Sequence, residues 1–181
     1  MGEGVRPGSA VVAMKNLALV GVIPGSALKL AWFIPFKGMV SVVIGYRGYV
    51  ELAFAGSFLK DLHSDVVLRG EEVRYWKDEP GPRLLHEVGL ERNEDIDNVI
   101  GAYCIYHTRN GGRGIKLVQR DVVLALHKKA DGKSPWKLGH HVAMACKTAV
   151  RRVAGEWPQV PQLKLALRLD ELIEDLDQEQ G

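Results

Sequence analysis

The chain has 181 residues, of which 46% are hydrophobic and 25% charged, with a formal net charge of +2. This is the balance of an ordinary globular protein with a sizeable core. No apolar run approaches the length of a transmembrane helix, and the first residues lack the pattern of a secretory signal. The cysteines, Cys104 and Cys146, form no metal-binding or disulfide motif, so we expect a protein of the reducing cytoplasm with no membrane partner.

Charge is segregated along the chain. Residues 1–60 have a net charge of +4, and residues 61–99 have a net charge of −6. Residues 100–155 hold eleven basic and two acidic side chains, a net of +9, and residues 156–181 have a net of −5. A block at +9 suits a polyanionic partner. The alternatives are that the acidic blocks fold over it and neutralise it, or that acidic faces of one subunit meet basic faces of the next.

The first third of the chain predicts two helices around a β-hairpin. Residues 1–8 are expected to be disordered, and Ser9 is the expected N-cap of a helix over residues 10–20. Lys37 and Gly38 form a two-residue turn between the apolar strands 28–36 and 39–44. Apolar residues at helical spacing then predict a helix over residues 46–55.

The middle of the chain reads as strands. The segment HSDVVLRGEEVRYW has the pattern of a hairpin, which predicts that the strands 58–68 and 72–77 pair with each other. A strand over 84–88, an acidic loop over 91–97, and a second hairpin of residues 99–107 and 114–119 follow.

The last part reads as helices. Asp121 is the expected N-cap of a helix over residues 122–129, and a basic helix then follows the Pro135-Trp136 turn and ends at Gly155. We expect residues 159–168 to be extended and residues 169–179 to form a short acidic helix.

The basic block is the main functional signal. Lys147 and Arg151 are four residues apart, so they share one face of the predicted helix, with Arg152 beside them. Binding of a single strand requires cations along a groove and flat rings against bases, and Tyr46 and Trp136 are the candidate rings. An ordinary solvated basic face, and buried packing of both rings, are the structural alternatives.

Motifs for covalent chemistry are absent from the sequence. No P-loop and no nucleophile elbow occurs, and the six histidines lack metal-binding spacing. The acidic residues 91–97 suggest an Mg²⁺-dependent nuclease, but a solvated loop is the simpler interpretation.

The order of motifs resembles the RecT family of phage and prophage single-strand DNA annealing proteins. The resemblance rests on VIGYRGYVELA at residues 43–53, GGRGIKLVQR at 111–120, and PWK followed by MACKTAVRRV at 135–153. It covers most of residues 10–158. It implies a compact α+β core of antiparallel hairpins packed on helices. The chain departs from the family pattern at Cys146, where a second lysine is common, and in its short N-terminal region.

The resemblance implies an ATP-independent recombinase without covalent chemistry, which pairs complementary DNA strands as a ring or helical filament in the cytoplasm of a bacterial host. It implies no cofactor, with Mg²⁺ as a modulator of DNA binding, and a phage exonuclease or host single-strand binding protein as partner. We expect an annealing domain over residues 9–158 and an acidic extension over 159–181. The alternatives are a metal-dependent nuclease and a structural or adaptor domain. The predicted DNA-binding residues are Lys37, Tyr46, Arg47, Arg113, Lys116, Arg120, Lys128, Lys133, Trp136, Lys147, Arg151 and Arg152.

Overall fold

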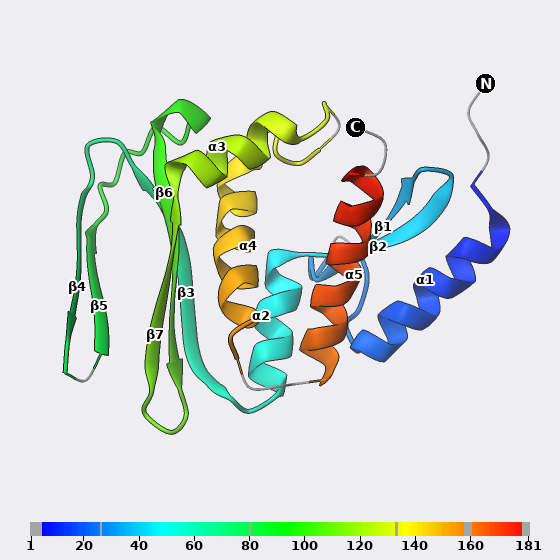
Figure 1. Ribbon diagram of the computed structural model, residues 1–181, viewed down its shortest axis with the longest axis horizontal. Helices are drawn as coiled ribbons and strands as arrows, with labels where there is room; N and C mark the ends of the chain where they lie inside the picture. Colours follow the sequence, from blue (N-terminus) through cyan, green and yellow to red (C-terminus); the bar gives the residue numbers. More distant parts are fainter. Residues whose placement is uncertain (1–4, 26, 80, 133, 158–160, 179–181) are drawn as a thin grey trace. The chain divides into compact units, whose positions relative to one another are not determined.

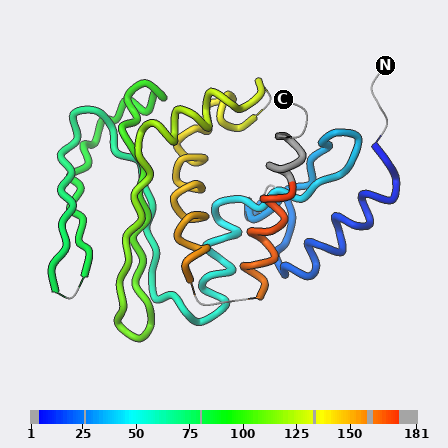
Figure 2. The backbone as a smooth tube through the Cα atoms, in the orientation of Figure 1, coloured from blue at the N-terminus to red at the C-terminus, as the bar shows by residue number. Residues whose placement is uncertain are grey.

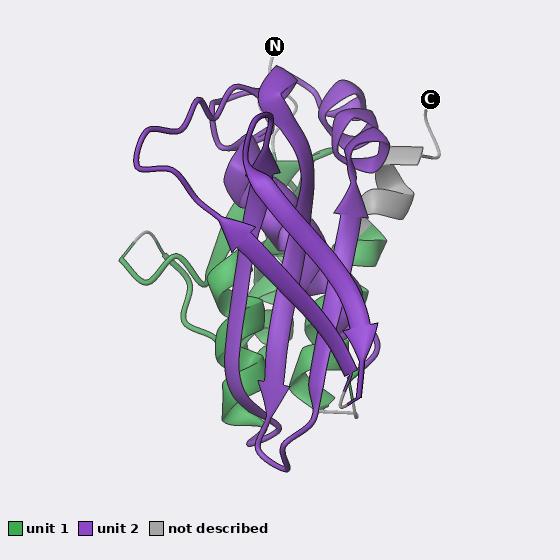
Figure 3. Ribbon diagram, turned by 90° about the vertical axis from the view of Figure 1, so that its left-hand side faces the viewer, with its two compact units in different colours: residues 1–56, 157–181 green, residues 57–156 purple. Residues whose placement is uncertain are grey.

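The computed structural model of the protein describes residues 5–25, 27–79, 81–132, 134–157 and 161–178, with side chains as far as residue 172. It has an α+β fold of helices and antiparallel sheets, which confirms the predicted fold class. The chain forms two compact units (Figure 3). Unit 1 consists of residues 1–56 and 157–181, and unit 2 consists of residues 57–156. The predicted domain boundaries at residues 8 and 158 stay a prediction.

Unit 1 combines helices with an antiparallel β-hairpin. Helix α1 contacts strand β2, and α5 contacts β2, α1 and α2. Strand β2 and helix α2 have the predicted bounds. The elements of unit 1 are α1 Pro7–Val20, β1 Ala31–Phe36, β2 Met39–Ile44, α2 Tyr46–Ala55 and α5 Pro161–Gln178 (Figure 1).

The two ends of unit 1 differ from the prediction. Helix α1 begins at Pro7, and Ser9 is not its N-cap: the Ser9 hydroxyl donates to the carbonyl of Arg6 at 2.6 Å and accepts from the N–H of Val40 at 2.9 Å, which ties α1 to β2. Helix α5 begins at Pro161, so the prediction of extended structure over residues 161–168 is wrong. Proline is tolerated in the first helical turn because an N–H there has no intrahelical partner.

A buried carboxylate joins three elements of unit 1. The Tyr49 hydroxyl donates to Asp170 Oδ2 at 2.7 Å, and the N–H of Ile44 donates to Oδ1 at 3.4 Å. Asp170 is 5% exposed and Tyr49 is fully buried, so both bonds lie out of water. Because a buried polar group is costly without hydrogen-bond partners, these two bonds fix α5 against α2 and β2.

Unit 2 is built on the antiparallel sheet β3–β6–β7, with a separate hairpin β4–β5. The second predicted hairpin, β6–β7, is confirmed. Helix α3 begins at Arg120 with Gln119 as its N-cap, so Asp121 lies in the first turn instead. The elements of unit 2 are β3 Leu59–Leu68, β4 Glu72–Asp78, β5 Gly81–Glu87, η1 Ile96–Asn98, β6 Val99–Thr108, β7 Arg113–Gln119, α3 Arg120–Lys129 and α4 His141–Ala154 (Figure 2).

The predicted pairing of residues 58–68 with 72–77 is wrong. Strand β3 pairs with β6, as in Val66 opposite Ala102, and β4 pairs with β5, as in Tyr75 opposite Leu84. Every residue of β4 is exposed, whereas β6 is buried along most of its length. The apolar end of β3 therefore buries more surface beside β6 than it would beside β4.

The two faces of the sheet in unit 2 have different neighbours (Figure 1). Ser64 donates to the carbonyl of Cys146 on α4 at 3.4 Å, so its face meets the helix. Tyr103, on the opposite face, contacts His86 of β5 through its hydroxyl at 3.1 Å. Side chains alternate between faces along a strand, so odd-numbered residues of β6 and β7 face the hairpin and even-numbered residues face α4.

Candidate nucleic-acid interface

Lys37 lies at the tip of the β1–β2 hairpin. Lys37 and Gly38 both have positive φ, 48° and 71°, which is the type I′ geometry that matches the twist of the strands. The Lys37 side chain is exposed, and its Nζ lies 5.4 Å from the centre of the Phe36 ring. A lysine in this conformation is strained relative to glycine or asparagine.

Tyr46 and Arg47 begin helix α2. Arg47 is exposed, and Tyr46 is half-buried. Gly48 follows them because α2 comes close to the chain before β1: a Cβ at this position would overlap the carbonyl oxygen of Leu30. The motif that carries the family resemblance therefore has two roles. Gly48 allows α2 to pack closely on the chain before β1, and Arg47 lies exposed on the surface of unit 1.

Arg113 and Lys116 lie on opposite faces of β7. Arg113 faces the hairpin, where its Nη2 donates to the carbonyl of Gly81 at 3.5 Å. Lys116 faces the α4 side and forms an ion pair with Glu156, just after the end of α4. These two residues therefore do not form one row of cations, and strand alternation alone could have predicted this.

The Arg120 side chain forms hydrogen bonds to backbone carbonyls. Its Nη1 donates to the carbonyls of Asp97, at 2.9 Å, and Val99. These bonds connect the start of α3 to the start of β6. The structure thus gives Arg120 a fold-stabilising contact, although the guanidinium has further N–H groups that can reach a phosphate.

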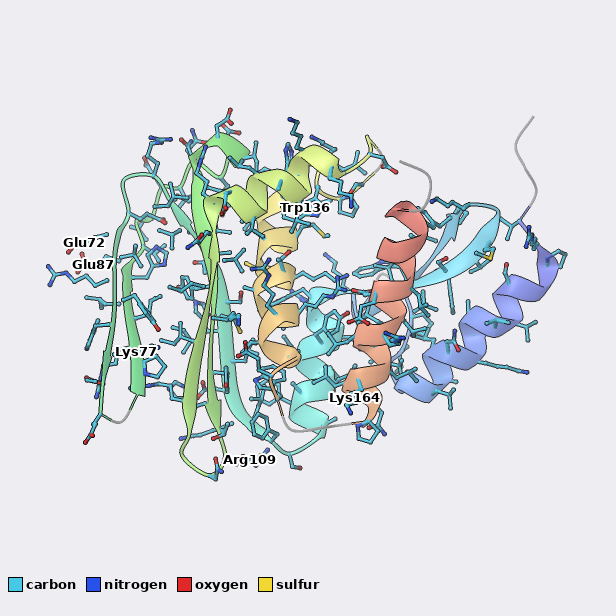
Figure 4. The ribbon with its side chains drawn as sticks, viewed as in Figure 1. Glu72, Lys77, Glu87, Arg109, Trp136 and Lys164 are labelled. Atoms are coloured by element: carbon cyan, nitrogen blue, oxygen red, sulfur yellow. The ribbon has the colours of Figure 1, made fainter. Side chains whose placement is uncertain are left out.

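Trp136 is buried, with 6% of its surface exposed, and its ring lies edge-on to the ring of His127, with 6.4 Å between centres. Base stacking on Trp136 would require this ring to be uncovered. Lys128 is exposed near the end of α3, and Lys133 lies outside the described residues. Figure 4 shows Trp136 beside α3 and Arg109 at the β6–β7 turn, at opposite ends of unit 2.

Helix α4 carries the remaining predicted cations. The helix packs on β3, β6 and β7. Its buried residues are small or apolar, namely Ala145, Cys146, Ala149, Val150, Val153 and Ala154. Arg152 is exposed, whereas Lys147 and Arg151 are half-buried on the flank between the buried and the exposed side. The predicted sharing of one face by Lys147 and Arg151 follows from their spacing on this helix.

The acidic block of residues 61–99 is partly neutralised by its own arginines. Arg92 Nε donates to Glu71 at 2.8 Å, its Nη1 to Asp65 at 3.1 Å, and its Nη2 to the carbonyl of Val66 at 2.8 Å. On the hairpin, exposed pairs join Arg74 to Glu72 at 3.1 Å and Arg83 to Asp78 at 2.6 Å. All of these contacts join residues within the acidic block, so none of them involves a residue of the basic block 100–155.

Glu71 is the centre of this network. Burial by itself raises the pKa of its carboxyl, but hydrogen bonds from the Leu68 N–H, Arg92 and His86 outweigh burial, so the pKa lies below its usual value of 4.5. His86 also contacts Tyr103, and burial raises the pKa of Tyr103 to about 12. The network is therefore charged at Glu71 and neutral at Tyr103 near neutral pH.

The cysteines have no features of reactive thiols. Both are buried and outside any disulfide, and burial raises the pKa of Cys104 to about 12 and of Cys146 to about 11. A protonated buried thiol is a poor nucleophile. Among the described residues, no group of three or more His, Cys, Asp or Glu side chains is arranged to hold a metal ion.

The sequence analysis missed one cluster. His127 at the end of α3, Lys137 in the following loop and His141 at the start of α4 lie together. The sequence gives no signal for this cluster, because the contact between the two histidines depends on the path of the loop that joins α3 to α4. In the part of the chain that the structure describes, none of the helices is both long and apolar enough to cross a membrane.

Comparisons with known proteins agree with the resemblance seen in the sequence. The family model of the RecT family matches residues 3–180. The chain is similar to Protein RecT of Escherichia coli (strain K12), with 31% identity over 175 residues that cover 90% of this chain and 62% of RecT. It is also similar to the uncharacterized protein YqaK of Bacillus subtilis (strain 168), with 29% identity over 155 residues, 83% of this chain and 52% of YqaK. The chain thus spans less than two thirds of the length of these relatives. The match over residues 3–180 shows that this chain belongs to the RecT family.

Proposed function

We propose that this protein binds single-stranded DNA and anneals complementary strands in recombination, without ATP. The observation that carries the proposal is the family match over residues 3–180, supported by 31% identity to a protein named RecT. Arg47, Lys147, Arg151 and Arg152 occupy the family's basic motifs and are the residues we expect to contact phosphates.

The charge distribution supports an anionic partner. Arg92, Arg83 and Arg74 pair with acidic residues of their own block. The net charge of −6 that this block keeps is smaller in magnitude than the +9 of residues 100–155. The ion pair between Lys116 and Glu156 favours the alternative of internal neutralisation at one position. The balance favours a polyanion as the partner of the basic block.

The proposed mechanism is electrostatic. Cations neutralise phosphates and release their counterions, while the bases of the held strand stay available for pairing. This process forms and breaks no covalent bond, so we assign no catalytic residue, no cofactor and only a modulating role to Mg²⁺. Repetition along DNA requires contact between neighbouring copies, and we propose a homo-oligomer, either a ring or a helical filament, that works in the bacterial cytoplasm beside an exonuclease or a host single-strand binding protein.

A double variant of α4 tests the DNA contacts. Each phosphate contact on single strands adds about 0.7 to the slope of log K against log salt. Lys147→Ala with Arg151→Ala should therefore lower the slope by about 1.4, measured by fluorescence anisotropy with labelled oligo(dT). Arg74→Ala with Lys77→Ala, which removes the same charge from β4, is the matched control and should leave the slope unchanged.

Three results would change the proposal. A wild-type protein that does not retain single strands at low salt would favour the adaptor. Strands cut during incubation with Mg²⁺ would favour the nuclease. A large drop in the melting temperature of the α4 variant would make Lys147 and Arg151 structural residues.

A further inference from the structure

Three nitrogen-bearing side chains from separate elements converge at one end of unit 2. Lys137 Nζ lies 3.4 Å from His127 Nδ1. The rings of His127 and His141 are 6.4 Å apart between centres and meet edge to face. Among the described residues no carboxylate forms an ion pair with any of the three, and Asp97 is the one acidic group whose charge acts on His127.

The hydrogen bonds define the protonation of the two rings. A lysine ammonium only donates, so His127 Nδ1 accepts and the ring carries its proton on Nε2. His141 Nε2 donates to the backbone carbonyl of Glu94, which leaves Nδ1 as its second nitrogen. The rings of Trp136 and His127 meet edge to face, and this contact helps to hold the His127 ring in place.

Positive charge outweighs negative charge around His127. Burial lowers the pKa of His127, and the positive charges of Lys137 and His141 lower it further. Asp97 of η1 opposes this effect only weakly, and Lys128 and Lys129 add positive charge on the same helix. An anion beside the rings would relieve this repulsion and favour protonated His127.

We propose that His127, Lys137 and His141 form a phosphate subsite that binds one phosphodiester of the held single strand. Lys137 supplies a positive charge and turns its ammonium from His127 Nδ1 to the phosphate. His127 Nδ1 then takes up a proton from solvent, because the anion stabilises the imidazolium. The identity of the ligand as DNA rests on the proposed function, whereas affinity of the cluster for phosphate does not.

The first experiment uses inorganic phosphate and the imidazole C–H signals of the protein in NMR. The signals of His127 and His141, assigned with His127→Gln and His141→Gln, should shift together as phosphate is added. The signal of His63, an exposed residue on β3, is the internal control and should stay in place. Signals of His127 and His141 that do not move would overturn the subsite.

The second experiment measures oligo(dT) affinity against salt and pH. Lys137→Gln should lower the salt slope by about 0.7, and Lys77→Gln on β4 should not. Because the pKa of His127 lies below its usual value of 6.5, wild-type affinity should rise as the pH falls toward and below about 6.5, and His127→Gln should weaken this rise. Equal salt slopes in wild type and Lys137→Gln would overturn the subsite, and equal pH dependence in wild type and His127→Gln would do the same.

The two experiments distinguish failure of the phosphate subsite from failure of the proposed function. Phosphate-induced shifts without any retention of oligo(dT) would sink the proposed function and leave the subsite standing. Retention of oligo(dT) without those shifts would sink the subsite alone. If His127→Gln lowers the melting temperature, Lys137→Gln still tests the subsite, because Lys137 is exposed in a loop.

Discussion

Replacing Arg92 with methionine tests whether ion pairing holds the acidic block of unit 2 together. The substitution removes the bonds to Asp65, Glu71 and the Val66 carbonyl, at 2.8–3.1 Å, and leaves both carboxylates without their cation. Removing one partner of a buried pair costs about 3–5 kcal/mol. Because the side chains of Arg92, Asp65 and Glu71 are 16%, 19% and 10% exposed, we expect the lower end, about 3 kcal/mol.

This cost should appear as a fall in melting temperature of about 6–12 °C, measured by circular dichroism at neutral pH. Arg74→Met is the matched control: its pair with Glu72 is exposed, so the change should be small. A loss for Arg92→Met no larger than that of the control would refute the reasoning.

The pH dependence gives a second readout of the same variant. Glu71 has a lowered pKa in the folded protein, so its contribution to stability is present above the unfolded value of about 4.5 and is lost as the pH falls through the folded pKa. Without Arg92, burial raises the pKa of Glu71 relative to wild type. The stability difference between wild type and Arg92→Met should therefore shrink as the pH falls below about 4.5. A difference that stays constant would assign the role of Arg92 to packing.

Three further substitutions test unit 1. Gly48→Ala should cost about 2–3 kcal/mol in urea unfolding because its Cβ overlaps the Leu30 carbonyl, whereas Gly8→Ala, with open space around it, should not destabilise; equal effects would contradict the close approach. Tyr49→Phe should cost about 1.5–3 kcal/mol through the lost bond to the Asp170 carboxylate, and an unchanged urea midpoint would count against it. Lys37→Asn should stabilise by about 0.4–1 kcal/mol and weaken binding of oligo(dT), and unchanged binding would remove Lys37 from the proposed interface.

Elements whose formation depends on residues close together in the chain were predictable from the sequence. The Lys37-Gly38 turn and helical spacing after Gly45 gave the first hairpin and α2. The pairing of β3 was not predictable in this way, because its partner β6 is distant in the chain and the turn at Gly70 mimics a hairpin. The start of α5 was not predicted because Pro161 stands in its first turn, where a proline has no N–H to lose.

The positive charge of the candidate interface was predictable from the sequence, but the positions and contacts of its side chains were not. The basic block is visible in the sequence, whereas the backbone contacts of Arg120 and the pairing of Lys116 with Glu156 depend on the folded chain. The opposite faces of Arg113 and Lys116 follow from strand alternation and could have been read from their odd spacing. The family resemblance was recognisable because its motifs combine packing glycines such as Gly48 with surface cations.

The annealing rate of complementary oligonucleotides is the most direct test of the central claim. The rate should be measured by fluorescence quenching with purified protein, without ATP and without divalent metal. We predict annealing well above the spontaneous rate, with a reduced rate for Lys147→Ala combined with Arg151→Ala. A protein that retains single strands but leaves annealing at the spontaneous rate would contradict the account.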